Sequence, residues 1–309
     1  MKKPIKIKVI GIGGSGGNAI LRMNDFDLSD DVELIAINTD YKDLKKSKAD
    51  VQIKIENKTS QGLGTGMNPK IAREAAEANK EEIKKQLEGA DLALIAGGLG
   101  GGTCSGASPV VAEIAKEVGI LTVAIVTLPF SFEGKKRMKI AKESKKLLEK
   151  EVDALITIKN DKLMEIFDLK TSVEEAFWAC DDILRKAVSS ISSLVLSSGI
   201  VDVDFADVKS ILKNSGTAFF GIGFGKGKNR SKKALEEAIK SPFLDSSIEG
   251  AKGVLFNVSG EEISLTEVEE IGKMISKKID SKAKVIFGVA QDKKVKKGQI
   301  KIALVATGF

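Results

Sequence analysis

Three glycine-rich stretches are the residues of this sequence with the clearest potential for chemistry. They are GIGGSGGN at 11–18, QGLGTGMNP at 61–69 and GGLGGGTCSGASP at 97–109. A dense run of glycine is kept where the backbone must adopt positive φ or lie against something too close for a Cβ. Backbone N–H groups between a strand and a following helix bind anions, aided by the helix dipole. Three such loops around one sheet edge predict a polyphosphate held from several sides, as a nucleoside triphosphate would be.

The first of these stretches also supports a second interpretation. Gly11, Gly13 and Gly16 fit the G-x-G-x-x-G pattern of dinucleotide-binding loops, and Asp40 ends the next strand pattern, where a ribose ligand is expected. An NAD(P)-dependent Rossmann oxidoreductase is therefore one alternative, and a tight turn without a ligand is another. A dehydrogenase needs one such loop, so the other two loops favour the triphosphate.

The composition excludes several other kinds of site. The chain has 309 residues, no histidine and two cysteines, Cys104 and Cys180. Ser-His and Cys-His mechanisms are therefore absent, and a zinc site or a disulfide framework has few ligands. The net charge of +6 comes from both signs scattered along the sequence, which is weak support for nucleic-acid binding. No apolar run reaches the ~20 residues of a membrane span, and the amino-terminal residues show no signal-peptide cleavage site. We expect a cytoplasmic protein that neither binds nucleic acid nor inserts into a membrane.

The first half of the chain alternates apolar runs with helical patterns. Expected strands lie at 5–12, 33–38, 92–97, 121–128 and 154–158, with helical stretches at 69–87 and 135–151. Strands that are apolar on both faces and separated by helices imply a parallel sheet covered on each side. We predict a doubly wound α/β domain that ends near residue 170.

The second half has a different pattern. Residues 171–198 form one uninterrupted helical pattern, with Thr171 or Ser172 as the expected N-cap. Strand patterns follow at 217–225, 252–260, 284–292 and 300–309, and helical patterns at 229–241 and 264–278. We predict a long connecting helix followed by a smaller α/β domain with a mixed sheet.

Seven short motifs carry a resemblance to a known family. They are INTD at 37–40, GLGTGMNP at 62–69, GGGTCSG at 100–106, PFSFEGKKR at 129–137, IKNDKL at 158–163, VDVDFADV at 201–208 and VATGF at 305–309. Their order and spacing resemble FtsZ, the prokaryotic cell-division relative of tubulin, over essentially the whole chain. The resemblance implies the tubulin/FtsZ fold, with a GTP-binding domain at 1–170, a central helix and acidic loop at 171–203, and a C-terminal GTPase-activating domain at 204–309.

The resemblance also implies a site for GTP or GDP. Asp181 would accept hydrogen bonds from both N1–H and the exocyclic amine of guanine, which predicts GTP over ATP, and Phe177 would stack on the purine. From spacing alone Phe177 is equally a core aromatic. Mg²⁺ is expected mainly on phosphate oxygens and water, with K⁺ as a further cation and no dedicated protein metal site. The implied binding residues are Gly13, Gly14, Ser15, Asn18, Asn38, Asp40, Thr65, Gly66, Gly100, Gly101, Gly102, Thr103, Cys104, Ser105, Gly106, Pro129, Glu133, Arg137, Asn160, Phe177 and Asp181.

Hydrolysis in the family is completed by the next subunit. The resemblance implies that Asp204 and Asp207, with Asp202 beside them, enter the neighbour's site and polarise the attacking water. Such head-to-tail contacts do not close, so they generate filaments. We expect a self-polymerising GTPase for cell division, and a nucleotide-binding filament protein with little turnover is an alternative. Without the resemblance, this segment is an ordinary acidic helix N-terminus.

Two positions, Cys104 and Asp202, depart from the family pattern. Cys104 stands where the signature G-G-G-T-G-[ST]-G has glycine. Its thiol either weakens GTP binding or is tolerated in a helix-like backbone, where the helix N-terminus would acidify it. Asp202 stands where the family usually has asparagine, so the added anion predicts slow turnover or a greater dependence on Mg²⁺ or K⁺.

The family commonly continues past the position of Phe309 into a tail that docks on membrane-tethering division proteins, and such partners are left open here because no such tail follows.

Overall fold

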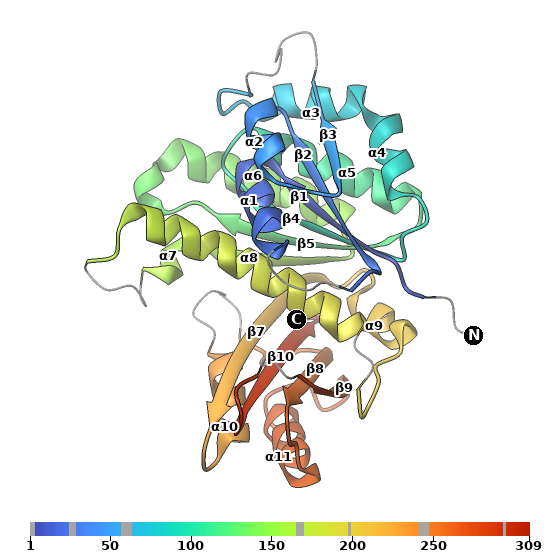
Figure 1. Ribbon diagram of the computed structural model, residues 1–309, viewed down its shortest axis with the longest axis vertical. Coiled ribbons are helices and arrows are strands. Elements are labelled where there is room, and N and C mark those ends of the chain that lie inside the picture. Colours follow the sequence, from blue (N-terminus) through green and yellow to red (C-terminus); the bar gives the residue numbers. More distant parts are fainter. Residues whose placement is uncertain are drawn as a thin grey trace. The chain divides into compact units, whose positions relative to one another are not determined.

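The computed structural model describes residues 4–24, 29–56, 64–164, 170–196, 199–240, 247–292 and 295–309. The chain divides into two compact units, Met1–Ser189 and Ser190–Phe309. The division falls within one long helix, α8 (Val173–Leu196), shown in yellow-green in Figure 1. The functional partition at residues 170 and 203 is a different division, and it stays a prediction.

The described strands of the first unit form a parallel sheet with the order β3-β2-β1-β4-β5-β6. This order confirms the predicted doubly wound fold, because the chain moves outward from β1 in one direction and then from β4 in the other. Ligands in such folds bind at the carboxyl ends of the strands where the order reverses, here between β1 and β4. The strands are β1 (Ile7–Ile12), β2 (Val32–Asn38), β3 (Val51–Lys54), β4 (Leu92–Gly98), β5 (Leu121–Leu128) and β6 (Ala154–Lys159).

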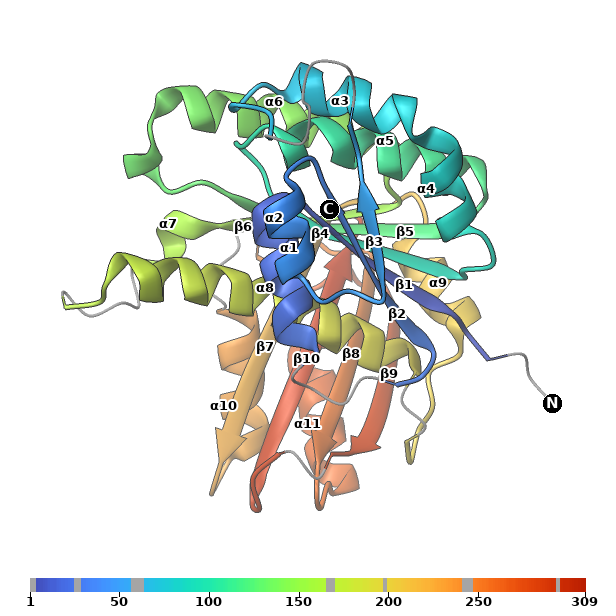
Figure 2. The ribbon, with the colours of Figure 1, turned by 45° about the horizontal axis from the view of Figure 1, so that its top comes forward.

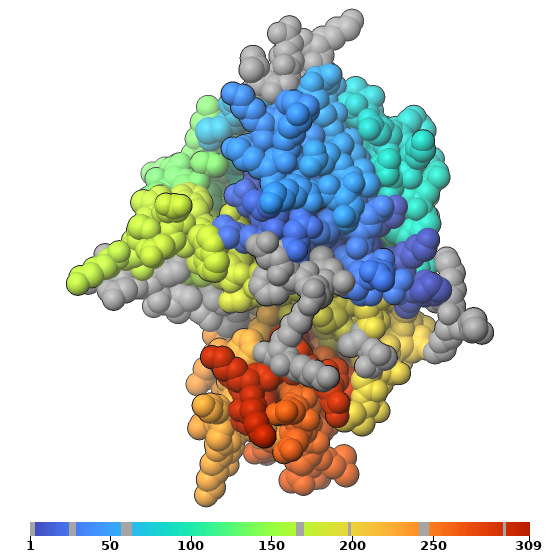
Figure 3. All heavy atoms as spheres, viewed as in Figure 1, coloured from blue at the N-terminus to red at the C-terminus, as the bar shows by residue number. Residues whose placement is uncertain are grey.

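Helices cover both faces of this sheet, so the central strands must be apolar on both sides. All eight residues of β5, LTVAIVTL, are buried. Figure 2 shows α3 to α6 on one side of the strands, with α1 and the start of α8 on the other. In Figure 3 the amino-terminal elements, blue to cyan, form a closely filled surface. The helices before α8 are α1 (Gly13–Met23), α2 (Tyr41–Lys46), α3 (Pro69–Ala78), α4 (Lys80–Leu87), α5 (Thr103–Glu117), α6 (Lys135–Glu151) and α7 (Asn160–Leu163).

Three local features refine the sequence expectations. The predicted helix at 69–87 is two helices, because Asn79 leaves helical geometry and its side chain donates to the Ala75 carbonyl at 2.7 Å. Strand β3 was not predicted, since VQIK is short and half polar. Ser172 is the N-cap of α8: its hydroxyl accepts from the Glu175 N–H at 3.2 Å, and the Glu175 carboxylate accepts from the Ser172 N–H at 2.7 Å.

The second unit holds a mixed sheet with the order β7-β10-β8-β9 among its described strands. Strand β10 is antiparallel to β7 and β8, whereas β8 and β9 are parallel, as a mixed sheet predicts. Over the described ranges, none of the helices in either unit combines the length and apolarity needed to cross a membrane. The elements are α9 (Phe205–Leu212), β7 (Gly216–Lys226), α10 (Arg230–Ile239), β8 (Gly253–Gly260), α11 (Leu265–Ser276), β9 (Lys284–Gln291) and β10 (Gln299–Thr307).

Alternate glycines on β7 let α10 lie directly on the sheet. Gly221 and Gly223 share one face of the strand. A Cβ at either position would collide with the backbone of α10, at Ala238 and Ala234 respectively. The two glycines are two strand residues apart, or about 6.7 Å, and the two alanines are four helix residues apart, or about 6 Å. The spacings are similar, so each glycine can lie opposite one alanine of the helix. The GIGFG sequence is therefore a packing surface.

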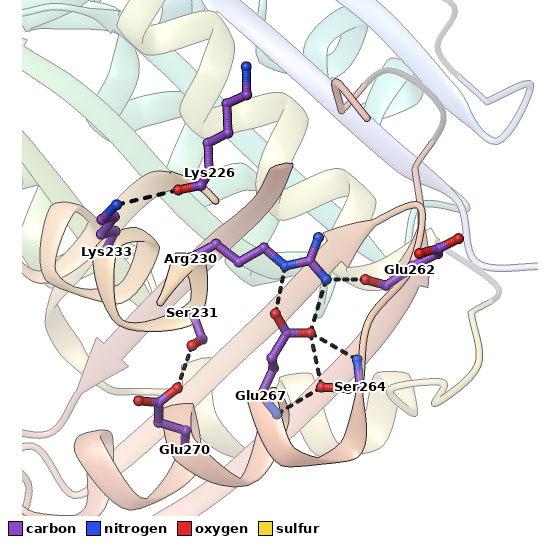
Figure 4. Close-up of polar contacts among 8 residues, drawn as sticks. All are labelled: Lys226, Arg230, Ser231, Lys233, Glu262, Ser264, Glu267 and Glu270. Atoms are coloured by element: carbon purple, nitrogen blue, oxygen red, sulfur yellow. Dashed lines mark hydrogen bonds and ion pairs between the residues drawn. The ribbon is translucent and has the colours of Figure 1, made fainter. Parts of the chain in front are cut away.

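An arginine ties α10 to α11 (Figure 4). Arg230 Nε lies 2.6 Å from Glu267 Oε1 and its Nη2 lies 3.0 Å from Oε2, while Nη2 also donates to the Glu262 carbonyl. The Glu267 carboxylate also accepts from the Ser264 N–H at 2.9 Å, which completes a capping box. The hydrogen bonds from Arg230 lower the pKa of Glu267. One carboxylate thus starts α11 and fixes it to α10.

Gly223→Ala is expected to lower the free energy of unfolding by about 1–3 kcal/mol in urea titrations, because the added methyl overpacks the contact with α10. The new Cβ would lie 2.5 Å from the Ala238 nitrogen. Gly272→Ala in α11 is the matched control, since a Cβ there meets no atom within 4 Å. Alanine is favoured over glycine in a helix by about 1 kcal/mol, so the control is expected to be neutral or stabilising. Equal destabilisation by both substitutions would contradict the close approach of β7 and α10.

Candidate functional site

A cavity of about 410 Å³ lies in the first unit at the carboxyl ends of β1, β4, β5 and β6. This volume is within the usual range for small-ligand sites. It brings together residues from six separate segments of the chain. The predicted binding residues on its lining are Gly13, Gly14, Ser15, Asn18, Gly101, Gly102, Thr103, Cys104, Pro129, Glu133, Arg137, Asn160, Phe177 and Asp181.

Four further lining residues were not among the predicted ones: Gly98, Leu99, Thr127 and Cys180. Gly98 and Leu99 belong to the glycine-rich stretch at 97–109. Including the whole stretch among the predicted binding residues would have found them. Thr127 is the penultimate residue of the buried strand β5. Cys180 precedes Asp181 on α8 and is 3% exposed.

Two of the helices that begin at the cavity, α1 and α5, start within glycine-rich stretches and have no side-chain cap. Neither α1, after Ile12, nor α5, after Gly102, has a capping hydrogen bond from a side chain. The first N–H groups of a helix have no intrahelical partner, and together with the helix dipole they favour an anion. Helices α2 and α3 differ, because Asp40 and Asn68 cap them. The open starts of α1 and α5 are groups that could hold phosphate.

The first glycine loop is specialised at three positions. Gly13 has a φ of +72°, which L-residues with side chains rarely adopt. Gly11 and Gly16 allow strand and helix to touch, since a Cβ on Gly16 would lie 2.6 Å from the Ala96 carbonyl oxygen. The glycines therefore serve both turn geometry and close packing, and Gly13 and Gly14 line the cavity.

A hydrogen bond to the hydroxyl of Ser105 closes the third glycine loop. Gly100 has a φ of +102°, and its N–H donates to Ser105 Oγ at 2.8 Å in a buried contact. Gly106 packs under α3, because a Cβ there would collide with the Pro69 carbonyl. Gly100, Ser105 and Gly106 do not line the cavity. They fix the loop that presents Gly101, Gly102 and Thr103.

Asn38 and Asp40, which were predicted to bind, do not line the cavity and instead order the end of β2 and the start of α2. Asp40 accepts from the Lys42 N–H at 2.8 Å, and Asn38 accepts from the Asp40 N–H at 3.1 Å. Thr39 and Thr103 share a hydrogen bond of 2.7 Å, which links β2 to the start of α5. The second glycine stretch lies partly outside the described residues, at 61–63. Two members of its described part were also predicted to bind: Thr65, whose side chain lies against Gly102, and Gly66, with a φ of +55°.

One wall of the cavity is built around the buried Asp181. Ser15 Oγ donates to Asp181 Oδ1 at 2.8 Å, and Asn18 Nδ2 donates to Oδ2 at 2.9 Å. Burial raises the pKa of Asp181, against these hydrogen bonds and the charge of Arg22. Phe177, one helical turn earlier, is 39% exposed and meets the buried Phe130 edge-on, with ring centroids 5.5 Å apart. A planar ring with two adjacent donors fits this combination of carboxylate and aromatic face.

Another part of the lining carries polar atoms without partners. Glu133 accepts from the Phe130 N–H at 2.8 Å, and its other oxygen lies 2.9 Å from Arg137 Nη1. Within the described residues, Arg137 Nε and Asn160 Oδ1 are buried and have no hydrogen-bond partner. Buried polar atoms normally have hydrogen-bond partners, so an unpaired donor and an unpaired acceptor on one cavity indicate that a polar ligand binds there.

Cys104 is accommodated by a glycine beneath it. It lies in the first turn of α5 and is 4% exposed. Its sulfur occupies the space beside Gly97, where a Cβ would lie 2.5 Å from Sγ. The helix-like backbone agrees with the tolerant alternative, but the expectation of an acidified thiol is wrong, because burial raises the pKa of Cys104 to about 12.

The acidic residues of the second unit are held on a fixed loop. The Ile200 and Val201 N–H groups donate to the Val289 carbonyl at 2.8 and 3.2 Å, and the Gly199 N–H donates to Asp202 Oδ1 at 2.5 Å. Asp204 then caps α9 by accepting from the Ala206 N–H at 2.9 Å. Asp207 lies in the first turn of the same helix. Among the described residues, no group of three or more histidine, cysteine, aspartate or glutamate side chains lies together as a metal cage.

Comparisons with known proteins agree with this geometry. Residues 6–168 match the GTPase domain of the Tubulin/FtsZ family, and residues 216–309 match the C-terminal domain of the FtsZ family. The chain belongs to the tubulin/FtsZ family. Membership confirms the resemblance and replaces the NAD(P)-dependent oxidoreductase interpretation. It implies GTP or GDP binding and GTPase chemistry in general.

Solved structures of this family cover nearly the whole chain. An empty FtsZ dimer from M. jannaschii is 42% identical with a TM-score of 0.94, and the match covers 100% of this chain and 89% of that chain. A point mutant of M. jannaschii FtsZ gives 42% identity and a TM-score of 0.93, with 99% and 91% covered. A GTPγS-bound CetZ2 protofilament from Haloferax volcanii shares the fold at 22% identity and a TM-score of 0.81, with 98% and 92% covered.

Both cysteine thiols are expected to react slowly with alkylating reagents at neutral pH. Burial raises the pKa of each to about 12, and for Cys180 the charges of Asp181 and Glu133 add to the effect. A raised thiol pKa leaves the unreactive neutral form. Mass spectrometry would follow labelling of the native protein, with urea-unfolded protein as the control that reacts rapidly. Rapid labelling of native Cys104 would contradict its position beside Gly97.

Proposed function

We propose that this protein binds GTP in the cavity of its first unit, assembles head to tail, and hydrolyses GTP in sites that a second copy completes. The observation that carries the proposal concerns the carboxylates on the described lining. Asp181 is held by Ser15 and Asn18, and Glu133 by Arg137 and the Phe130 N–H. Both carboxylates are engaged in these contacts, and the acceptor positions that remain on Asp181 are assigned below to the base. We therefore infer that the cavity serves binding and that the group which activates the water comes from elsewhere.

The triphosphate would lie on the open starts of α1 and α5. Backbone N–H groups of Gly13, Gly14 and the 101–103 segment would donate to phosphate oxygens, with the Thr103 hydroxyl beside them. Mg²⁺ would be bound by phosphate oxygens and water, which suits a cavity without a carboxylate cage, and its charge would offset that of the phosphates. K⁺ is a second cation that the same oxygens could bind.

Guanine would be recognised at Asp181. A carboxylate offers about four acceptor positions, so both oxygens can accept from guanine while Ser15 and Asn18 keep their bonds. Adenine would place an acceptor at N1 against the same anion. The exposed face of Phe177 would stack on the purine, and the open Asn160 Oδ1 would accept from a ribose hydroxyl.

Hydrolysis would use Asp204 and Asp207 of a second copy. A carboxylate about 3 Å from the attacking water can orient and polarise it. Because the surface that carries the acids differs from the surface that holds the nucleotide, each added copy leaves another site open and the assembly grows as a filament. The M. jannaschii FtsZ dimer and the CetZ2 protofilament are precedents for self-association in this fold.

The 42% identity to FtsZ favours cell division, at the septum and in the cytoplasm, as the biological task. Division proteins that tether such filaments to the membrane would be further partners. A filament protein with little turnover is the alternative, and the assay below separates the two.

Phosphate release and pelleting should be measured together over a range of protein concentrations with GTP, ATP and NADH. The proposal predicts pelleting with GTP and a turnover per molecule that rises with protein concentration. Pelleting without phosphate release would select the filament protein without turnover. Turnover per molecule that is independent of concentration would contradict the shared site.

Asp181→Asn is expected to weaken GTP binding about 100-fold or more, because the amide presents a donor to the guanine donors in a buried site. Equilibrium titration with a fluorescent GTP analogue measures the loss. Glu174→Gln is the matched control on the exposed face of α8 and should bind as the wild type does. Unchanged GTP affinity in Asp181→Asn would mean that this carboxylate does not bind the base.

Asp202→Asn is expected to raise GTP turnover, since it removes a negative charge near the incoming triphosphate while the amide oxygen still accepts from the Gly199 N–H. Asp202→Ala separates the two effects because it loses the charge and the loop contact together, and it should lower turnover. Phosphate release at saturating GTP is the measurement. A rate for Asp202→Asn at or below the wild-type rate would refute the role assigned to the charge.

A further inference from the structure

The carboxylate of Asp207 belongs to a closed set of polar contacts within the second unit. Lys284 Nζ lies 2.9 Å from Asp207 Oδ1 and 2.8 Å from Ser210 Oγ. The Ser210 hydroxyl in turn donates to the Asp207 backbone carbonyl at 2.7 Å. The direction of the Asp207 side chain is therefore set by an ammonium group that is itself held by the next turn of α9.

Lys284 reaches α9 from the first residue of β9, which is 77 positions further along the chain. Its backbone is fixed by the sheet, because it pairs with Gly253 on β8 and its N–H donates to the Lys252 carbonyl at 2.9 Å. Strand β9 also holds the loop that leads into α9, through Val289. One strand thus positions both the acidic loop and the cation beside it.

Stability is a poor explanation for this contact. The side chains of Lys284 and Asp207 remain 51% and 46% exposed, and an exposed ion pair contributes only about 0–1 kcal/mol. The position of the lysine is more informative, because Asp202, Asp204 and Asp207 place three negative charges within six residues. A lysine ammonium is a compact charge with three donors, so it can hold a carboxylate and offset part of that charge together.

We propose that Lys284 is a positioning residue for GTP hydrolysis. The inference rests on the proposed function, in which Asp207 approaches the γ-phosphate bound by a second copy. Lys284 holds Oδ1 of Asp207 in one direction and leaves Oδ2 to accept a hydrogen bond from the attacking water. It also reduces the repulsion between the acidic loop and the triphosphate, an effect that grows when the interface excludes water.

Lys284→Met is the first test, because a half-exposed surface change should leave the thermal unfolding midpoint unchanged. The expected result is about tenfold lower kcat at saturating GTP, with the KM for GTP and GTP-dependent pelleting unchanged. Lys284→Arg should restore most of the rate, since a guanidinium also binds a carboxylate. The matched control is Lys282→Met, which removes one positive charge from the exposed turn before β9, where the described contact of Lys282 is from its backbone N–H to Asp280.

A double-mutant cycle separates positioning from a general effect of charge. If Lys284 acts through Asp207, Lys284→Met should have no further effect in the Asp207→Ala background. The inference is overturned by the same tenfold loss in both backgrounds, by an unchanged kcat in Lys284→Met alone, or by loss of pelleting in that variant. Failure of the proposed function looks different, because Asp207→Ala would then turn over GTP at the wild-type rate.

Discussion

The cavity of the first unit depends on the N-termini of α1 and α5, which no side chain caps. The open N–H groups of α1 and α5 need acceptors, and glycines at both helix starts, among them Gly13, Gly14, Gly101 and Gly102, line the cavity. Helices α2 and α3 show the other solution, since Asp40 and Asn68 cap them and neither residue lines the cavity. The open N–H groups of α1 and α5 lie at the junctions after β1 and β4, where the order of the parallel strands reverses.

The two units have complementary chemistry. The first presents donors, an aromatic face and carboxylates that are already engaged, which suits recognition of an anionic nucleotide. The second presents aspartates on a loop fixed to β9 and on the first turn of α9. In the proposed function this separation links hydrolysis to assembly, because a bound triphosphate meets its carboxylates only when another copy arrives.

The sequence predicted every described strand except β3, together with the long helix and the glycine loops, because these depend on local composition and hydrophobic pattern. It could not separate the glycines that line the cavity from those that pack, such as Gly106, since that depends on where α3 crosses α5. The direction of the Cys104 thiol required the position of Gly97 on a neighbouring strand. Lys284 was missed because its partner Asp207 is 77 residues away and nothing local marks the contact.

The central claim is that one copy supplies the pocket and another the carboxylates, and mixing two impaired variants tests it most directly. Asp181→Ala removes nucleotide binding but keeps the acidic loop, whereas Asp207→Ala keeps the pocket. Phosphate release and pelleting should be measured for each variant and for their mixture. The shared site predicts that the mixture hydrolyses GTP faster than the sum of the separate variants. A mixture that co-pellets but releases phosphate only at that sum would contradict it.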